Sequence, residues 1–316
     1  MKRILTTVFI MMFLLVAVTG CQQKEETVKI GHLRITMSLP TYVALEKGFF
    51  ADQGLKVELV PFNSGTTVID ALVAGRIDAN CGSSVTGHWF AAQNAPDRFK
   101  VFLLFGSTDN KGDKTFVVVV RKDSSIKDLK DLKGKKIGTF PGATSVSLAR
   151  LAVGTQTDPK GVIFTEIPPP NLVPALASRQ IDAFFSPEPF GMIAASKGLG
   201  KYLMKSPLTL LNLENGVPGG AFSFNAKFLK ERPKAAKKVK IAIEKALDYI
   251  RENDKEVRPI LAKHTGLPEP VAMRLPFDEW IKMKEFNKNA GQEYFDILYE
   301  DGAYKQKVDT TKLYYE

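Results

Sequence analysis

The sequence predicts an α/β protein built from two similar lobes. Strand-like and helix-like segments alternate along the first two thirds of the chain, which is the pattern of a parallel sheet with crossover helices. One unit of helix, tight turn and strand also occurs twice, as ALVAGRIDAN at residues 71–80 and as ALASRQIDAF at residues 175–184. A unit that is used twice favours two similarly built lobes over one continuous sheet.

The first third of the chain alternates between strand and helix. Apolar and polar residues alternate at 55–60, as in a half-buried strand. Pro40 suits the first turn of a helix, where its missing N–H costs nothing, and Gly48 is typical of the position after a helix end. Gly75 ends a second helical pattern in the same way. We therefore expect three strands and two helices, with the strands at 28–31, 55–60 and 76–79 and the helices at 39–47 and 68–74.

The alternation continues in the middle of the chain. Strands are expected at 101–105 and 116–120. The β-branched run VVVV at 117–120 is expected to be a buried strand that crosses from one lobe to the other. The pattern then restarts, with expected strands at 136–139, 162–164 and 181–185 and expected helices at 144–153 and 172–178.

The last third of the chain changes character. Residues 233–252 carry an apolar stripe at helical spacing, formed by Val239, Ile243, Ala246 and Ile250. Such a stripe predicts a long amphipathic helix that packs one face on a core. Shorter helical patterns follow at 257–264 and 286–298.

The N-terminus has the composition of an export signal. Lys2 and Arg3 precede an almost unbroken apolar run at 4–18, which is shorter than the roughly 20 residues that span a bilayer. The run ends in the tetrapeptide VTGC, which resembles a bacterial lipobox. An ordinary signal that happens to precede a cysteine is the alternative. We expect a signal peptide, a lipid attachment site and a tether, at residues 1–20, Cys21 and residues 21–27.

The charge balance and the cysteines exclude several classes of protein. Lys and Arg exceed Asp and Glu by 44 to 34, a formal net charge of +10, which falls to +8 without Lys2 and Arg3. The lysines are scattered and no nucleic-acid motif interleaves them with aromatic residues, so no nucleic-acid partner is expected. Cys81 has no partner for a disulfide once Cys21 is lipidated, and it is expected to pack as a small apolar residue. The three histidines are not spaced for a metal, and no metal or other cofactor is expected.

Five stretches in order carry a resemblance to a known family. They are PTYVALEKGFFADQGLKVELVPFNSGTTVIDALVAGRIDANCGSS, VVVVRKDSSIKDLKDLKGKKIG, GATSVSLAR, IDAFFSPEPF and FLKERPKAAKKVKIAIEKALDYI. Together these stretches cover nearly the whole chain after the predicted signal. The sequence resembles the substrate-binding proteins of ABC importers, specifically the group for nitrate, sulfonates, taurine and thiamine precursors.

The resemblance implies an α/β fold of the type II periplasmic-binding-protein kind. In that fold two crossing hinge strands join two lobes, and the ligand lies in the cleft between them. Mapped onto this chain, lobe 1 is expected at 28–118 and 223–316, and lobe 2 at 119–222. The resemblance also implies a monomer that delivers a small-molecule solute to an ABC permease and its ATPase. Its place would be the extracytoplasmic face of the bacterial cell membrane, where the lipid anchors it.

Three clusters of small and hydroxyl residues are the first candidates for solute contact. In parallel sheets ligands bind at the carboxyl ends of the strands, where the following helices begin. Helix N-termini offer free N–H groups and a partial positive potential, which suit an anion. A serine or threonine there can equally be a helix cap, but three clusters at equivalent strand ends favour ligand contact. The clusters are Gly65-Thr66-Thr67, Ser83-Ser84 and Gly142-Ala143-Thr144-Ser145.

The loop after the first strand supplies further candidates through the resemblance. His32, Arg34 and Ser38 lie there, with Thr36 between them. Arg34 is predicted to recognise charge, because a guanidinium pairs bidentately with a sulfonate or a carboxylate. A surface arginine is the alternative for this residue. His32 is predicted to be a hydrogen-bonding residue of the cleft wall rather than a metal ligand.

Glu188, in the stretch SPEPF, matches the acidic residue that the family places at a strand end. It either meets an amine or ring nitrogen of the ligand or bonds a backbone group of the hinge, and both roles stay open. An acid beside Arg34 would favour a zwitterion or a heterocycle over an inorganic anion. Few aromatic residues fall at the predicted cleft positions, which favours a compact solute.

The expected function is a non-catalytic receptor for a small organic solute or anion of the sulfonate, nitrate or taurine kind. A pyrimidine, a thiamine precursor or another heterocycle is the alternative solute. An enzyme on the same scaffold is a further alternative. Pyrimidine-synthesising relatives rely on a cysteine-rich motif and a reactive histidine, however, and this sequence has no such cluster. A sensor that signals through a membrane protein is the third candidate function.

Overall fold

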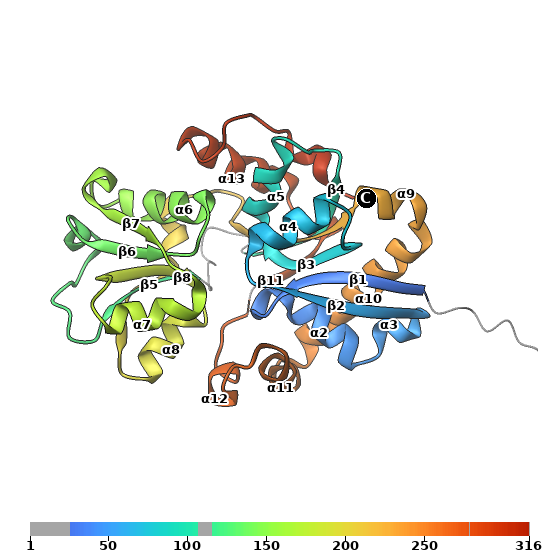
Figure 1. Cartoon of the computed structure of the whole chain (residues 1–316), viewed down its shortest axis with the longest axis horizontal. Helices are drawn as coiled ribbons and strands as arrows, with labels where there is room; N and C mark the ends of the chain where they lie inside the picture. The colour runs from blue at the N-terminus through green and yellow to red at the C-terminus, as the bar shows by residue number, and fades with distance from the viewer. Residues whose placement is uncertain (1–25, 107–115, 278, 316) are drawn as a thin grey trace, which may run out of the picture.

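The computed structural model describes residues 26–106, 116–277 and 279–315. Its strands form two separate sheets, each with helices packed on it, which gives the molecule two lobes (Figure 1). The predicted two-lobed α/β fold is confirmed. The predicted signal peptide and Cys21 lie outside the described residues. Within the described ranges, no helix has the length and apolar character needed to cross a membrane.

The first lobe is built on a sheet of six strands in the order β11-β4-β10-β3-β1-β2. β1 pairs in parallel with β2 and β3, whereas β10 runs antiparallel to β3 and β4. The strands of this sheet are β1 (Glu26–Leu33), β2 (Leu55–Phe62), β3 (Ala79–Ser84), β4 (Phe99–Gly106), β10 (Pro218–Asn225) and β11 (Glu279–Lys282).

The helices of the first lobe begin and end largely at the predicted signals. Gly48 adopts the left-handed conformation with φ of 73°, which glycine reaches without strain, and this stops the first long helix. The predicted stripe Val239, Ile243, Ala246 and Ile250 is buried along one face of α10. The helices are α2 (Leu39–Glu46), α3 (Phe49–Asp52), α4 (Gly65–Val73), α5 (Val85–Ala92), α9 (Ala226–Glu231), α10 (Pro233–Glu252), α11 (Asp254–Thr265), α12 (Glu269–Ala272) and α13 (Lys288–Glu300), with the 3-10 turns η2 (Thr36–Ser38), η7 (Met283–Glu285) and η8 (Thr310–Leu313).

The second lobe is built on a sheet of five strands in the order β7-β6-β8-β5-β9. These strands are β5 (Phe116–Arg121), β6 (Lys136–Thr139), β7 (Ile163–Glu166), β8 (Ala183–Pro187) and β9 (Gly200–Lys205). Helices α6 (Ala143–Gly154), α7 (Leu172–Ala177) and α8 (Phe190–Ser196) pack on it, with 3-10 turns η3 (Leu129–Leu132), η4 (Pro159–Gly161), η5 (Pro169–Asn171) and η6 (Pro207–Leu211).

The repeated unit of the sequence makes the same contact in each lobe. In the first lobe, the Asp78 carboxylate accepts a hydrogen bond from the backbone N–H of Lys29 at 2.8 Å. In the second lobe, the Asp182 carboxylate accepts one from the N–H of Lys136 at 2.9 Å. Each aspartate therefore ties the end of its helix unit to the lobe's first parallel strand, β1 or β6.

The chain passes between the lobes at places that differ from the expected one. The apolar run at 117–120 pairs along its length with β8 and β9, so it lies within the second sheet and does not cross. The chain leaves the first sheet after β4 and enters the second sheet at β5, and residues 107–115 lie outside the described residues. The second passage is the segment 206–217 between β9 and β10. The predicted lobe boundaries at 118 and 223 thus fall inside β5 and β10.

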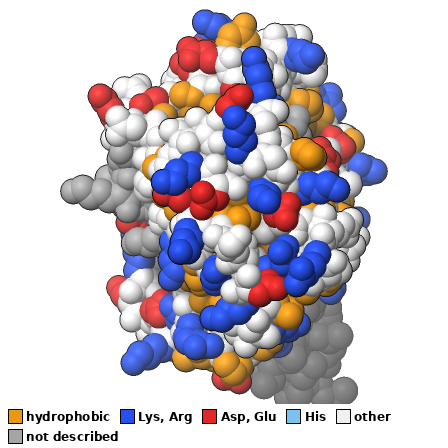
Figure 2. All heavy atoms as spheres, turned by 90° about the vertical axis from the view of Figure 1, so that its left-hand side faces the viewer, with side chains coloured by type: hydrophobic (Ala, Val, Ile, Leu, Met, Phe, Trp, Pro, Cys, Tyr) orange, Lys and Arg blue, Asp and Glu red, His pale blue; other side chains and the backbone are white. Residues whose placement is uncertain are grey.

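The charged side chains of the second lobe do not form a continuous basic patch on the face that Figure 2 shows. Lys and Arg are spread over this face, with acidic and uncharged side chains between them (Figure 2). Such interspersed charges are typical of a solvated surface.

Candidate functional site

A cavity of about 130 Å³ lies between the two lobes. The first lobe contributes the end of β1, the start of α4 and the junction of β3 with α5. The second lobe contributes the loop from β6 to α6 and the end of β8. The lining residues are Leu33, Ile35, Met37, Gly65, Thr66, Ser84, Thr86, Gly87, Phe116, Phe140, Pro141, Gly142, Ser145, Leu148, Phe185, Ser186 and Pro187.

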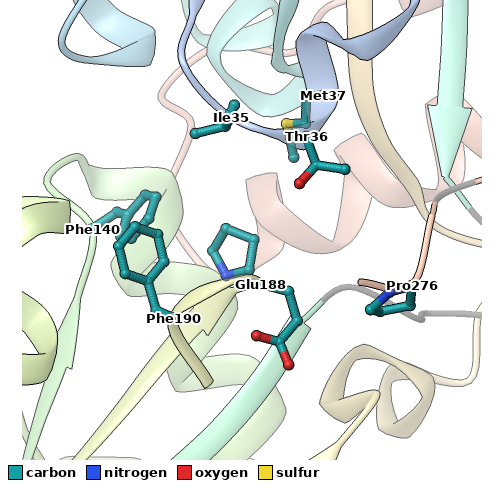
Figure 3. Close-up of a pocket in the computed structure, with 8 residues that line it drawn as sticks. Ile35, Thr36, Met37, Phe140, Glu188, Phe190 and Pro276 are labelled. Carbon is teal, nitrogen blue, oxygen red and sulfur yellow. The ribbon is translucent and has the colours of Figure 1, made fainter. Parts of the chain in front are cut away.

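A narrow extension of about 10 Å³ adjoins this cavity. It shares four residues with the main cavity and adds Thr36, Glu188, Phe190 and Pro276. Figure 3 shows Ile35, Thr36 and Met37 on one side of this space, with Phe140, Phe190 and Glu188 across from them. We call the cavity and its extension together the cleft.

The structure brings six of the predicted residues to the cleft: five line the main cavity, and Glu188 lines the extension. Gly65, Thr66 and Ser84 line the main cavity from the first lobe, and Gly142 and Ser145 line it from the second. Gly142 directly precedes α6 and has a φ of 121°. No described side chain caps the N-terminus of this helix. Contact of these residues with a solute stays a prediction.

Ala143 and Thr144 form the first turn of α6 directly after Gly142. Their contact with a solute stays a prediction, because nothing is described of their side chains.

Thr67 and Ser83 use their hydroxyls inside the first lobe. The Thr67 N–H donates to Ser64 Oγ at 3.2 Å and the Thr67 hydroxyl donates to the Ser64 carbonyl at 3.0 Å, which caps α4. Ser83 is fully buried and its Oγ accepts a hydrogen bond from the Asn80 side-chain amide. Neither residue lines the cleft.

Ser38 fastens the end of β1 to β3. Its hydroxyl lies 2.7 Å from the Leu33 carbonyl and 3.1 Å from the Cys81 carbonyl, and it is fully buried. A Cβ atom on Gly82 would lie 2.3 Å from Ser38 Oγ, so the two chain segments meet at this glycine. Ser38 therefore positions the loop that carries Ile35 and Met37, and it does not itself line the cleft.

His32 and Arg34 lie in a different pocket. That pocket is an open depression of about 470 Å³ beside α11, where Lys263 and His264 complete its basic residues. The Tyr42 hydroxyl donates to the Leu33 carbonyl and accepts from His32 Nδ1 at 2.9 Å. Burial lowers the pKa of His32. The structure thus places the predicted charge-recognising Arg34 outside the cleft.

Glu188 lies at the wall of the cleft and is itself hydrogen-bonded within the second lobe. Its Oε1 accepts from the Tyr202 hydroxyl at 2.6 Å, and its Oε2 accepts from the Met192 N–H at 2.9 Å. Burial raises the pKa of the carboxyl group. The carboxylate therefore holds the first turn of α8 against β9, and Glu188 lines the extension of the cleft across from Thr36 (Figure 3).

Sequence reasoning missed the aromatic wall of the cleft. Phe116, Phe140, Phe185 and Phe190 all line it, which is contrary to the expectation of few aromatic residues. The Phe116 and Phe185 rings lie 5.3 Å apart, and the Phe140 and Phe190 rings lie 5.4 Å apart at 83°. Phe140 directly follows β6, and Phe185 lies near the end of β8. Ligands bind at the carboxyl ends of parallel strands, so the positions of these two residues in the sequence were a signal for the cleft.

Two further hydroxyls lie at the cleft: that of Ser186, which was not predicted, and that of Thr36, which the sequence placed in the candidate loop after the first strand. Ser186 in β8 is fully buried, and Thr36 in η2 is 6% exposed. Neither Ser186 Oγ nor Thr36 Oγ1 has a hydrogen-bond partner among the described residues. Both residues line the cleft, one from each lobe.

Cys81 and the acidic residues form no reactive or metal-binding cluster within the described ranges. Cys81 is fully buried in β3, where burial raises the pKa of its thiol. Among the residues that the structure describes, no group of three or more His, Cys, Asp or Glu side chains is placed to hold a metal ion.

Comparison with solved structures defines the class of the fold. The alkanesulfonate-binding protein SsuA from Xanthomonas axonopodis pv. citri, bound to MOPS, superposes with a TM-score of 0.73 at 20% identity, over 92% of this chain and 98% of that protein. The fold is therefore that of the two-lobed periplasmic binding proteins. The profile of the NMT1-like family matches residues 21–266, and the chain belongs to this family.

Relatives of the chain have different named functions. The nitrate/nitrite binding protein NrtA of Nostoc sp. PCC 7120 is 27% identical, over 74% of this chain and 57% of its own length. A putative aliphatic sulfonates-binding protein of Bacillus subtilis is 26% identical, over 98% of this chain and 93% of its own. A 4-amino-5-hydroxymethyl-2-methylpyrimidine phosphate synthase of Aspergillus parasiticus is 26% identical over 78% of this chain. The chain spans 57% of the length of the Nostoc protein and 63% of the length of a second NrtA, from Synechocystis sp. PCC 6803.

Proposed function

We propose that the protein is an extracytoplasmic solute-binding receptor of an ABC importer. The observation that carries this proposal is the cleft, whose walls come from strand ends and helix starts of both lobes. A solute held there contacts both lobes at once, so its binding stabilises the closed arrangement over the open one. The closed form then docks on a permease, which takes the solute across the membrane.

We favour a receptor function over an enzymatic function for a protein with this fold. Of the described residues that line the cleft, none is a Cys, His or Lys, and Glu188 already accepts two hydrogen bonds. A nucleophile paired with a general base, which covalent catalysis requires, is therefore missing from the described wall. Turnover of any bound solute, followed by mass spectrometry, would contradict this reading.

The attachment of the protein to the membrane is part of the same proposal. The predicted lipobox assigns the lipid to Cys21, and the protein acts as a monomer beside its permease and ATPase. Mass spectrometry of the N-terminal peptide from cells tests the anchor, because lipidation adds a diacylglyceryl group and acyl chains to Cys21. An unmodified Cys21 would refute it.

A bulky substitution at the cleft tests the receptor function directly. Thr66 is exposed at the start of α4 and lines the cavity, so Thr66→Trp is expected to fill part of the cavity without disturbing the core. Solutes that raise the melting temperature of the wild-type chain are expected to lose this effect. Asp70→Trp, at an exposed site of the same helix outside the cleft, is the matched control. Equal solute binding by wild type and Thr66→Trp would place the solute elsewhere.

A further inference from the structure

Much of the net positive charge of the chain lies at one place in the first lobe. Residues 227–240, which span most of α9 and the first two turns of α10, hold seven Lys and Arg residues and one Glu. Residues 241–254, which follow directly, hold two basic and four acidic residues. Lysines that are scattered along the sequence as a whole are therefore concentrated at the junction of these two helices.

One face of α10 carries lysines that the described chain leaves unpaired. Lys237 and Lys238 follow Lys234 by three and four positions, so the three side chains project from the same face of the helix. Lys234 and Lys237 are exposed and Lys238 is half-buried, and none of them has an ion-pair partner within the described ranges. Ile241 continues the same face and is 40% exposed. We call these four side chains the α10 stripe.

The acidic residues that pair with α9 and α10 around the stripe bind other cations. Glu244, half-buried one turn beyond Ile241, marks the end of the stripe. The stripe therefore keeps its positive charge and is open to an external polyanion. The neighbouring ion pairs are Glu231 with Lys227, Asp78 with Arg232 and Asp52 with Lys245.

The first described residues of the chain lie beside the same helices. The Thr27 carbonyl accepts a hydrogen bond from Arg232 Nη2 at 2.8 Å, at the junction of α9 and α10. Lys238 Nζ lies 3.8 Å from the place that a Cβ atom on Gly54 would take, one residue before the start of β2. β2 pairs with β1 from its first residue, Leu55, which lies opposite Glu26. Figure 1 shows the start of β1 at the end of the first lobe that is turned away from the second lobe, where α3 and α9 also lie.

The predicted lipid anchor would bring this end of the first lobe to a membrane. Residues 22–25 separate Cys21 from Glu26, and an extended chain of this length reaches at most about 18 Å. A lipid on Cys21 therefore keeps the junction of α9 and α10 near the bilayer surface. Cationic side chains are attracted by an anionic bilayer over roughly a Debye length, about 8–10 Å at physiological salt.

We propose that the α10 stripe is a docking surface for an anionic phospholipid bilayer and orients the anchored receptor on it. This inference rests on the lipid anchor of the proposed function and adds a second, electrostatic contact to it. Each lysine presents a point charge on a flexible stem, which suits a fluid layer of phosphate headgroups, and Ile241 adds apolar contact at the interface. Because the stripe belongs to the first lobe, the second lobe stays free to close on a solute.

The orientation of the anchored protein tests the surface. The lipidated protein is purified from cell membranes and reconstituted into vesicles of phosphatidylcholine, alone or with an equal part of phosphatidylglycerol, so that the anchor holds it on both. Ile241→Cys takes the uncharged dye NBD, because Cys81 is fully buried and the lipid blocks Cys21. We expect energy transfer from this dye to rhodamine-labelled lipids to be at least about twofold higher on the charged vesicles at about 0.05 M salt. At about 0.5 M salt it should fall to the level of the uncharged vesicles.

The same dye on the second lobe is the control for position. Ile163→Cys lies at a 51% exposed site on β7, and its dye should show no rise on the charged vesicles. Equal energy transfer from residue 241 on both kinds of vesicle at low salt would overturn the inference, and so would a rise that high salt leaves unchanged.

Charge reversal of the stripe tests its lysines. The combined change Lys234→Glu, Lys237→Glu and Lys238→Glu is expected to abolish the rise at residue 241. A matched triple reversal in the second lobe lowers the net charge by the same amount and should leave the rise intact. Its sites are exposed lysines without an ion-pair partner within the described ranges, namely Lys122, Lys160 and Lys197.

Melting temperatures of both triple variants check that the fold is kept. If the stripe reversal lowers the melting temperature, the milder change of the same three lysines to Gln replaces it and should at least halve the rise. A rise that survives the change of the stripe, or that the second-lobe reversal abolishes equally, would overturn the inference.

The lipid anchor fails on a different result, namely that the purified protein does not stay on the uncharged vesicles. Binding of that protein to the charged vesicles at low salt would still support the α10 stripe as a docking surface. Its absence from both kinds of vesicle would overturn the anchor and the docking surface together.

Discussion

His88 lies in a buried hydrogen-bond network beneath the cleft. Its Nδ1 lies 3.0 Å from the Ser84 carbonyl, and its Nε2 lies 2.7 Å from Ser223 Oγ. A carbonyl only accepts, so Nδ1 carries the proton and Nε2 accepts from the Ser223 hydroxyl. The neutral ring therefore satisfies both neighbours, and it supports Ser84 at the cleft wall.

The stability of the fold is expected to fall in mild acid because of this residue. Burial lowers the pKa of His88 to about 4, whereas an unfolded histidine has a pKa of about 6.5. The unfolded chain therefore binds more protons between these values. The contribution of His88 is fully present above pH 6.5 and is lost as the pH falls towards 4, by about 3 kcal/mol in total.

Denaturant unfolding at pH 7, 5.5 and 4 checks the expectation, with His88→Gln as the comparison. The variant lacks the titrating ring, so its free energy of unfolding should fall less steeply over this range. Parallel pH profiles for wild type and variant would show that other groups cause the loss.

The alternation of side chains along an extended segment explains which residues of the loop after β1 line the cleft. Neighbouring side chains of an extended segment point to opposite faces, so Leu33 and Ile35 line the cleft while His32 and Arg34 face the pocket beside α11. The sequence showed polar residues at alternate positions, and polar residues were expected at a binding site. Which face of the segment meets the second lobe depends on tertiary packing, and this the local pattern does not contain.

At the scale of elements, the repeated helix, turn and strand unit was predictable because its signals are local. The unit also makes a contact that no local pattern reveals. The isoleucine that precedes each aspartate packs over a glycine of the neighbouring strand, with Ile77 over Gly31 and Ile181 over Gly138. A Cβ atom on these glycines would lie 2.4 Å and 2.7 Å from the respective Cδ1 atoms. The glycines therefore allow helix and sheet to approach closely in both lobes.

Overpacking at Gly138 is the prediction that belongs to this scale. Gly138→Ala is expected to lower the free energy of unfolding by about 1–3 kcal/mol, because the new methyl group meets Ile181 Cδ1. Ile181→Val removes that carbon atom, so the double variant should be less destabilised than the sum of the two single variants. Denaturant unfolding of all four proteins measures the coupling. Strict additivity would show that the glycine is not held by this contact.

At the scale of the whole molecule, the C-terminal segment contacts both the passage at 206–217 and the second lobe. Glu293 on α13 accepts hydrogen bonds from the Glu214 N–H at 3.0 Å and the Asn215 side-chain amide at 3.1 Å, in the passage between the sheets. Asp301, directly after α13, pairs with Arg150 on α6 of the second lobe. Residues 223–316 were expected to belong to lobe 1, yet this segment contacts both lobes. Pairs that lie 78 to 151 positions apart leave no mark in a local pattern.

The Arg150–Asp301 pair is expected to hold the lobes in the arrangement that forms the cleft. Two guanidinium nitrogens bind the carboxylate, and the pair is partly exposed, with side chains 36% and 14% accessible. Solvent limits such a pair to about 0.5–1 kcal/mol. Because it links α6 to the C-terminal segment, Asp301→Asn should shift the lobes towards the open arrangement and weaken solute binding about two- to fivefold. The loss should shrink in high salt, since screening already weakens the pair in the wild type.

Calorimetry gives the affinity, and X-ray scattering gives the radius of gyration of the ligand-free chain, which should rise. Glu231→Gln removes the exposed Lys227–Glu231 pair within α9 and is the matched control. If Asp301→Asn changes neither the affinity nor the radius more than this control does, the pair stabilises the local packing of α6 and does not set the balance between the lobes.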